Sequence, residues 1–382
     1  MTSTLQGESS NEQPPQQHRE QLPPPLLSSS SSSSSSSEYA SYIPIIDLSP
    51  LHDGSMAGKQ KVAQAIKLAC EDVGFFIITH HGVPPSIIHN AWAAATEFFD
   101  LPTEEKEKSV KMEGSQYPYG YSGFGGEVLS HSKAYEHAHH SSSSSSSSSS
   151  LPPSLPDPKE SFSIGPSDPA SGMPAVRWPP SPPSFAPAIA AYYQAMETLS
   201  SSLLELFALA LSLPPSFFTS LMIGHCSALR LLNYPPLPPS FPPSLRASPH
   251  TDYGILTLLR SGGRGLEVLR RREGEREGGG EWVAVPEVGD SFVVNLGDLM
   301  GRWTNDWWVS TMHRVVEEGE GEGGGKRRQA MAFFCNLPAR VMVECLETCR
   351  REGEAEPRHK PINAMEFLLQ KHHAATGVEK KE

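Results

Sequence analysis

The C-terminal half of the chain is a series of short apolar runs separated by proline and glycine. Each run is only a few residues long and rich in leucine, β-branched or aromatic side chains, a pattern typical of strands rather than helices. The runs are 229–234, 255–259, 266–269, 282–285, 291–296, 307–310, 313–316, 329–334 and 341–344. About eight strands at this spacing predict a jelly roll, whose two stacked sheets leave few free edges.

The N-terminal half instead alternates strand and helix patterns. A strand-like segment at 42–48 precedes apolar residues at helical spacing up to Gly74, then a buried strand at 75–79 and a helix from about Pro85 to Phe99. Apolar residues later recur every three or four positions over 187–213, which predicts a long helix. The expected fold is mainly β with flanking helices: a double-stranded β-helix (jelly roll) core with an α/β N-terminal region.

Two serine runs, 28–37 and 141–150, interrupt this pattern. They have too few apolar side chains to offset the entropy of ordering them. We therefore divide the chain into a disordered leader, an N-terminal region, a Ser/His-rich insertion, a jelly-roll region that includes the long helix, and a tail. These segments are 1–41, 42–126, 127–158, 159–370 and 371–382.

Composition limits the possible partners and compartment. The net charge is −12, and no dense Lys/Arg patch stands beside aromatic residues, so a nucleic-acid partner is not expected. The five cysteines are scattered and odd in number, which indicates free thiols in a reducing compartment. No apolar run reaches the roughly 18 residues of a membrane span, and the acidic residues of the leader are unlike an organellar transit peptide. We expect a cytoplasmic monomer that acts on a small molecule, with no membrane partner.

Two imidazoles and one carboxylate stand in the C-terminal half in an order that suits a metal ion. His250 and Asp252 are separated by a single residue. On a strand, residues with this spacing point to the same face. His313 would have to come from a neighbouring strand. A set of two histidines and one carboxylate binds Fe(II) and leaves open positions for a cosubstrate and oxygen. On these residues alone, a hydrogen-bonded histidine beside a carboxylate is the competing interpretation.

Further motifs surround these three residues in a fixed order. In the C-terminal half they are NYPP (233–236), HTDYG (250–254), LEV (266–268), NLGD (295–298), RWTND (302–306), STMHRV (310–315) and Arg328 before Phe333-Phe334. In the N-terminal half they are IPIIDL (43–48), GFF (74–76), HGVP (81–84), FF (98–99), Pro102 and Lys106. Together they resemble the Fe(II)/2-oxoglutarate-dependent dioxygenases of the isopenicillin N synthase-like superfamily, over about 42–126 and 159–370.

The resemblance implies a site as well as a fold. It implies Fe(II) held by His250, Asp252 and His313, with 2-oxoglutarate and O2 as cosubstrates. Arg328 matches the arginine that binds the distal carboxylate of 2-oxoglutarate, and a guanidinium fork suits a buried carboxylate. The alternation of Arg328 with Met331 and Phe333 is taken to indicate an inward side chain. Tyr234 matches a tyrosine whose hydroxyl commonly touches the cosubstrate.

The implied reaction couples oxidative decarboxylation of 2-oxoglutarate to hydroxylation or desaturation of a small organic molecule. The residues that would contact this molecule lie near the mouth of the barrel in the family and vary between relatives. Position alone suggests four candidates here: Tyr117, Tyr121, Phe124 and Phe334.

The sequence departs from the family pattern at three positions. Ala330 stands where the family has a serine that helps to hold the distal carboxylate, and one such hydrogen bond contributes about 0.5–1.5 kcal/mol. Leu232 replaces a common asparagine, and Trp307 replaces a common basic residue. Two alternatives therefore stay open: an iron oxidase of the same fold that does not use 2-oxoglutarate, and an inactive relative that only binds ligands.

Overall fold

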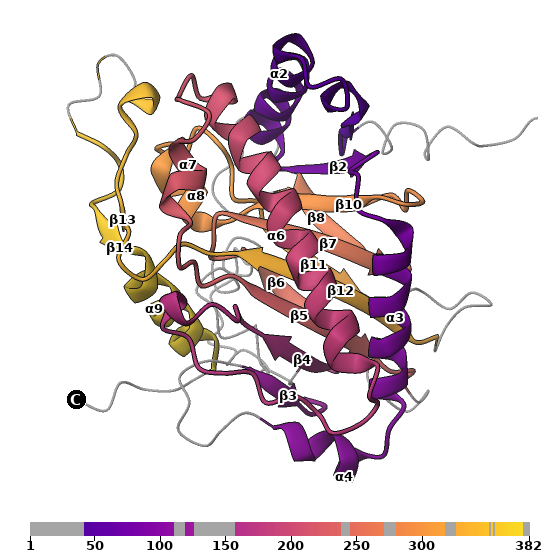
Figure 1. Ribbon diagram of the computed structural model, residues 1–382. Coiled ribbons are helices and arrows are strands. Elements are labelled where there is room, and N and C mark those ends of the chain that lie inside the picture. Colours follow the sequence, from indigo (N-terminus) through magenta and orange to yellow (C-terminus); the bar gives the residue numbers. More distant parts are fainter. Residues whose placement is uncertain are drawn as a thin grey trace, which may run out of the picture.

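The computed structural model describes residues 42–110, 119–125, 157–237, 245–270, 280–317, 326–350, 353 and 356–376. In this part of the chain two sheets are stacked face to face, with helices over one of them (Figure 1). The larger sheet has the strand order β1-β2-β10-β7-β12-β5-β4-β3, and the smaller has the order β6-β11-β8-β9. The predicted jelly-roll core is therefore confirmed.

The strands of the larger sheet are β1 (Ile45–Asp47), β2 (Phe75–Thr79), β10 (Phe292–Leu296), β7 (Leu256–Gly262), β12 (Arg328–Cys335), β5 (Ala228–Tyr234), β4 (Glu160–Ile164) and β3 (Gly120–Ser122). Those of the smaller sheet are β6 (Leu245–His250), β11 (His313–Val316), β8 (Leu266–Arg270) and β9 (Glu281–Ala284). A separate pair is formed by β13 (Met342–Val343) and β14 (Ile362–Asn363).

Three helices, α2 (Met56–Asp72), α3 (Pro85–Phe99) and α6 (Phe185–Ala210), cover the outer face of the larger sheet (Figure 1). The apolar stripe of α6 packs on this face, where Tyr193 meets Phe333 of β12 edge to face, with ring centroids 5.2 Å apart. Burial of each large apolar side chain contributes about 1.5–3 kcal/mol. The shorter helices are α4 (Thr103–Lys106), α7 (Phe217–Leu221), α8 (Asp298–Trp303) and α9 (Ala364–Thr376), and the 3₁₀ turns are Ser49–Leu51, Glu107–Ser109, Pro169–Ser171 and Glu347–Cys349.

The first four residues of strand β2 are all apolar. Phe76 and Ile78 belong to the core between the sheet and the helices, whereas Phe75 and Ile77 belong to the core between the two sheets. Because both faces of the strand are covered, neither set of alternate side chains is polar.

The N-terminal strand-helix-strand-helix unit is confirmed: β1 and β2 pair in parallel across α2, and α3 follows. This unit is not a separate domain, because β2 also pairs with β10 and so forms part of the larger sheet. The long helix is present at 185–210, close to the predicted 187–213. All five cysteines are free and buried. Among the described residues no helix has the length and hydropathy needed to cross a membrane.

Several sequence-based boundaries were wrong. No strand forms at 307–310, because Asn305 and Asp306 adopt left-handed backbone (φ 54° and 60°) and turn the chain, which buries Trp308 against Phe207. Residues 120–122 form β3, for which no strand was predicted, and helix α9 continues to Thr376, beyond the boundary placed at 370. The leader and most of the insertion lie outside the described residues.

Candidate active site

A cavity of about 260 Å³ lies between the two sheets. Alternate residues of β5 and β12 face it: Ala228, Arg230, Leu232 and Tyr234 from the first strand, and Arg328, Ala330, Ala332 and Phe334 from the second. The smaller sheet contributes His250, Val315 and His313, and α9 closes one side with Met365, Leu368, Leu369 and His372. The cavity therefore contains both the predicted metal ligands and the predicted 2-oxoglutarate residues.

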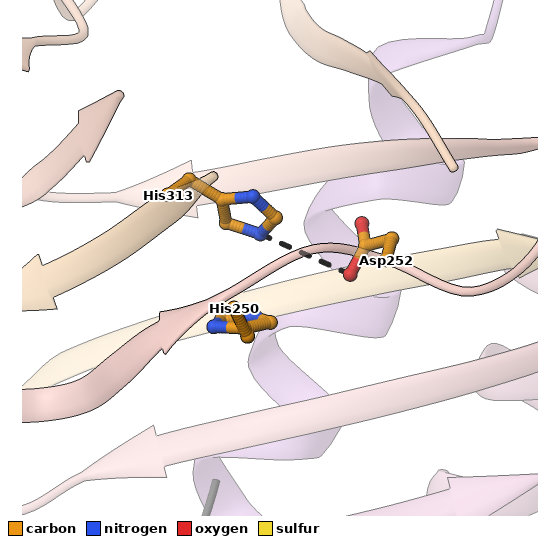
Figure 2. Close-up of side chains that lie close together, drawn as sticks. All are labelled: His250, Asp252 and His313. Carbon is orange, nitrogen blue, oxygen red and sulfur yellow. Dashed lines mark ion pairs between the residues drawn. The ribbon is translucent and has the colours of Figure 1, made fainter. Parts of the chain in front are cut away.

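His250, Asp252 and His313 converge in this cavity (Figure 2). His250 is the last residue of β6 and His313 the first of β11, and the two are paired in register with ring centroids 4.3 Å apart. Nε2 of His313 lies 3.8 Å from Oδ1 of Asp252, and one ligand atom from each residue lies within 4.8 Å of the others. Asp252 is not on the strand with His250, as the sequence suggested, but in the loop that follows β6.

Backbone carbonyls fix the orientation of both imidazoles. Nδ1 of His250 donates to the carbonyl of Ser248 (2.7 Å), and Nδ1 of His313 donates to the carbonyl of Thr311 (3.1 Å). A carbonyl oxygen only accepts, so Nδ1 must carry the proton in each ring. The neutral ring then has its lone pair on Nε2, the atom that is available to a metal.

The carboxylate of Asp252 is held in a similar way. Its Oδ2 accepts hydrogen bonds from Nδ2 of Asn295 and Oγ1 of Thr257, each at 2.6 Å, while Oδ1 faces His313. Burial alone would raise the pKa of Asp252, but the neighbouring His313 and His250 and these two hydrogen bonds outweigh it and hold the pKa below its usual value. Asp252 is therefore ionised at neutral pH.

The donor set fits a non-haem Fe(II) ion. Burial, and then the charge that His313 can carry, lower the pKa of His250 to about 4, so this imidazole is neutral at physiological pH as metal binding requires. Two imidazole nitrogens and one carboxylate oxygen form the facial set of non-haem iron oxygenases, which leaves positions for other ligands.

Gly297 lets the Asp252 loop pack closely on the start of α8. A Cβ atom on Gly297 would lie 2.3 Å from the carbonyl oxygen of Gly254, so the NLGD motif does not tolerate a side chain at this position. The close approach allows the amide of Asp298 to donate to the carbonyl of Asp252 (2.8 Å). The loop that carries the carboxylate is thus fixed by backbone contacts as well.

A buried ion pair supports the strand that carries His250. Nζ of Lys159 donates to Oδ2 of Asp157 (2.9 Å), with side chains 4% and 1% exposed. Oδ1 of Asp157 accepts from the amide and hydroxyl of Ser248, whose carbonyl holds His250. Asp157, assigned from sequence to the insertion, is therefore part of the support of the site.

Arg328 and Tyr234 lie opposite each other on β12 and β5. The guanidinium of Arg328 stands 5.0 Å from the centre of the Tyr234 ring, and both residues line the cavity. Arg328 lines the cavity, but not for the reason given from sequence, which was that it alternates with Met331 and Phe333. Those two residues face the helix-covered core, and Arg328 shares the inner face with Ala330 and Phe334.

The four candidate substrate residues do not come together. Phe334 lines the cavity. Tyr121 is buried outside its lining, where its hydroxyl donates to Glu160 (2.5 Å), and Phe124 is 53% exposed. Tyr117 lies outside the described residues.

Several residues around the site were missed by sequence reasoning. Asn295 and Thr257 hold the carboxylate of Asp252, and Ser261 of β7 contacts Arg328 (2.7 Å). Arg230 lines the cavity. Asn295 and Thr257 are buried polar residues within otherwise apolar strand runs, which is the signal that could have marked them, since such a side chain needs a hydrogen-bonding partner when it is buried. Ser261 lies between Arg260 and Gly262 and carries no such signal.

The contact between Asn295 and Asp252 leads to a prediction. Asn295→Ala removes one of two donors to Oδ2, so the carboxylate loses orientation and Fe(II) affinity falls by about 10–100-fold. Titration of the metal-free protein with Fe(II) under anaerobic conditions measures this. Asn90→Ala, on the exposed face of α3, is the matched control and leaves the affinity unchanged. Equal affinities for the two variants would contradict the assigned role of Asn295.

Two family models match the chain. Residues 43–188 match the model for "non-haem dioxygenase in morphine synthesis N-terminal", and residues 225–337 match the "2OG-Fe(II) oxygenase superfamily" model. The second match includes all three candidate metal ligands and Arg328.

Curated relatives are similar over most of their length. The 2-oxoglutarate-dependent dioxygenase caaD of Aspergillus niger is 32% identical over 73% of this chain and 81% of its own. The 2-oxoglutarate-Fe(II) type oxidoreductase hxnY of Emericella nidulans is 30% identical over 85% of this chain and 88% of its own.

Solved structures show the same fold. A full-length protein of Neurospora crassa, solved in complex with alpha-KG, superposes with a TM-score of 0.72 at 26% identity, covering 87% of this chain and 96% of that one. JOX2 in complex with 2OG, Fe and JA superposes with a TM-score of 0.64 at 25% identity, over 86% and 84% of the two chains.

Proposed function

We propose residue roles on the premise that this chain belongs to the 2-oxoglutarate-Fe(II) oxygenase superfamily. The protein is an Fe(II)/2-oxoglutarate-dependent dioxygenase that couples oxidative decarboxylation of 2-oxoglutarate to hydroxylation or desaturation of a small organic molecule. When bound, Fe(II) with 2-oxoglutarate and O2 supplies the oxidising power for a substrate C–H bond.

His250, Asp252 and His313 hold the Fe(II). The single observation that carries this proposal is the convergence of three ligand atoms, on the half-buried His250 and the buried Asp252 and His313, whose side chains are each held by a hydrogen bond. Because both Nδ1 atoms are held by carbonyls and Oδ2 is held by Asn295, the atoms left to face the ion are two Nε2 nitrogens and Oδ1. The protein thereby fixes the ligand geometry in advance.

Arg328 and Tyr234 bind 2-oxoglutarate. Arg328 supplies a positive charge and planar donors for the distal carboxylate, and Tyr234, 3% exposed, adds a hydroxyl in the same part of the cavity. The paired strands β5 and β12 hold these two residues in the same cavity as the metal ligands, which is what a cosubstrate binding both the iron and Arg328 requires.

The substrate occupies the part of the cavity beyond the metal ligands, between Phe334, Arg230 and the inner face of α9. The lining is apolar around Met173, Leu368 and Leu369, and Arg230, whose Nε donates to Ser163 (3.1 Å), adds a cation. This lining supports a substrate that is a largely apolar small molecule with an acidic or hydrogen-bond-accepting group. Tyr121 and Phe124 are not part of the proposed substrate site.

The protein acts as a cytoplasmic monomer without a nucleic-acid or membrane partner.

Succinate formation tests the function. The purified protein, loaded with Fe(II) in air, converts 2-oxoglutarate to succinate, and the correct substrate among a panel of small metabolites stimulates this release. Under anaerobic conditions, adding 2-oxoglutarate to the Fe(II) protein produces a visible charge-transfer band. If neither succinate nor the band appears, the proposed function is wrong. Acids that stimulate release while their methyl esters do not would identify the role of Arg230.

A further inference from the structure

The hydroxyl of Ser261 lies beside the guanidinium of Arg328. Ser261 is near the end of β7, on the strand next to β12, and its Oγ accepts a hydrogen bond of 2.7 Å from Nη2 of Arg328. The same Oγ donates to the carbonyl of Gly263 (3.2 Å), which orients its lone pairs toward the arginine.

The strand register places this serine directly opposite Ala330. Residues directly opposite on antiparallel strands have Cβ atoms about 4.5–5.5 Å apart, and their side chains point to the same face. Thr257 and Leu259, which alternate with Ser261 on β7, line the cavity, as does Ala330 on β12. A hydroxyl on residue 261 and a hydroxyl on residue 330 would therefore be cross-strand neighbours on the same face of the sheet.

The turn after β7 completes the support of Arg328. Gly263 and Gly265 adopt positive φ angles (104° and 100°), and the carbonyl of Arg264 between them accepts from Nε of Arg328 (3.0 Å). Ser261 and Arg264 thus hold Nη2 and Nε, while the Tyr234 ring lies 5.0 Å away. Nη1 has no hydrogen-bond partner among the described residues, so one donor group of the guanidinium is left for a ligand.

We propose that Ser261 is a positioning residue for 2-oxoglutarate that acts through Arg328 and so compensates for the serine missing at Ala330. The proposal rests on the assigned role of Arg328. The family serine would stand at position 330 on β12, the strand that carries Arg328. In this chain the hydroxyl comes from Ser261 on the neighbouring strand β7. Ser261 fixes the guanidinium before the cosubstrate arrives, so less conformational entropy is lost when the distal carboxylate binds.

The test is the affinity of the Fe(II) protein for 2-oxoglutarate, measured without turnover by anaerobic titration of the visible band. Ser261→Ala weakens binding about tenfold, as expected for losing a hydrogen bond to a charged group. Fe(II) affinity and thermal stability remain close to those of the unmodified protein. Ser261→Ala/Ala330→Ser regains most of the lost affinity, because the hydroxyl returns from the opposite strand.

Ser220→Ala is the control. It removes an exposed serine hydroxyl on α7, which donates to the carbonyl of Phe217, and leaves the 2-oxoglutarate affinity unchanged. Unaltered binding by Ser261→Ala would overturn the proposal, and so would a loss that Ala330→Ser does not reverse. If the unmodified protein does not bind 2-oxoglutarate at all, the proposed function fails; if it binds and Ser261→Ala binds equally well, only this inference fails.

Discussion

Asp252→Ala abolishes succinate formation and removes stoichiometric Fe(II) binding. Asp252 is the only anionic member of the candidate metal set in the described cavity, and its carboxylate is ionised and oriented by Asn295 and Thr257. Its loss removes a ligand and charge neutralisation together, so the fall in Fe(II) affinity exceeds the roughly 10–100-fold typical of losing an outer partner of a metal ligand. His250→Ala and His313→Ala have the same outcome, since each removes one of the two imidazoles.

Iron content after anaerobic loading and succinate release measure this effect. Asp72→Ala, which removes an exposed carboxylate at the end of α2, is the control and keeps both iron and activity. Iron retained at full stoichiometry by Asp252→Ala, together with undiminished turnover, would contradict the metal assignment.

Arg328→Met produces the second large effect, on 2-oxoglutarate rather than on iron. The variant removes the cation of the proposed distal-carboxylate site but retains an unbranched side chain on the inner face of β12. Truncating one partner of a hydrogen-bonded charge pair costs about 2–5 kcal/mol, which corresponds to a roughly 30-fold or larger rise in the Kd for 2-oxoglutarate. Arg328→Lys recovers only part of the loss, because an ammonium lacks the planar fork of donors.

Arg327→Met provides a close control for this experiment. Arg327 is the preceding residue, but it contacts Asp100 and Asn233 and does not line the cavity. Its substitution leaves the Kd for 2-oxoglutarate unchanged. The assignment of Arg328 fails if both variants bind 2-oxoglutarate equally well, or if Arg328→Met loses iron rather than 2-oxoglutarate.

The sequence by itself determined the elements with strong periodicity. The pattern of α3 predicted Pro85–Phe99, which are its bounds in the structure, because the apolar spacing and the flanking prolines agree on where it lies. The apolar run of β2 was equally clear, since side chains on both faces of this strand pack in a hydrophobic core. His250, Asp252 and His313 were also predicted from the sequence as candidate metal ligands, through the order of their surrounding motifs, and these three side chains lie together in the structure.

The sequence was less informative where local pattern and tertiary contact disagree. Strand β6, which ends at His250, was not predicted because Pro249 and a polar composition hide its alternation. Tyr121 and Phe124 were chosen by position along the chain. Only the folded chain shows that Tyr121 bonds Glu160 outside the cavity lining and that Phe124 is exposed.

What only the tertiary structure decided is how residues distant in sequence meet. The pairing of β6 with β11 places His250 opposite His313, and β10 brings Asn295 to Asp252. The pairing of β7 with β12 places Ser261 opposite Ala330, so a hydroxyl missing from one strand is available on the next. The physical reason is strand register: a shift of one residue turns each side chain to the other face, and no local pattern records which neighbour each strand will have.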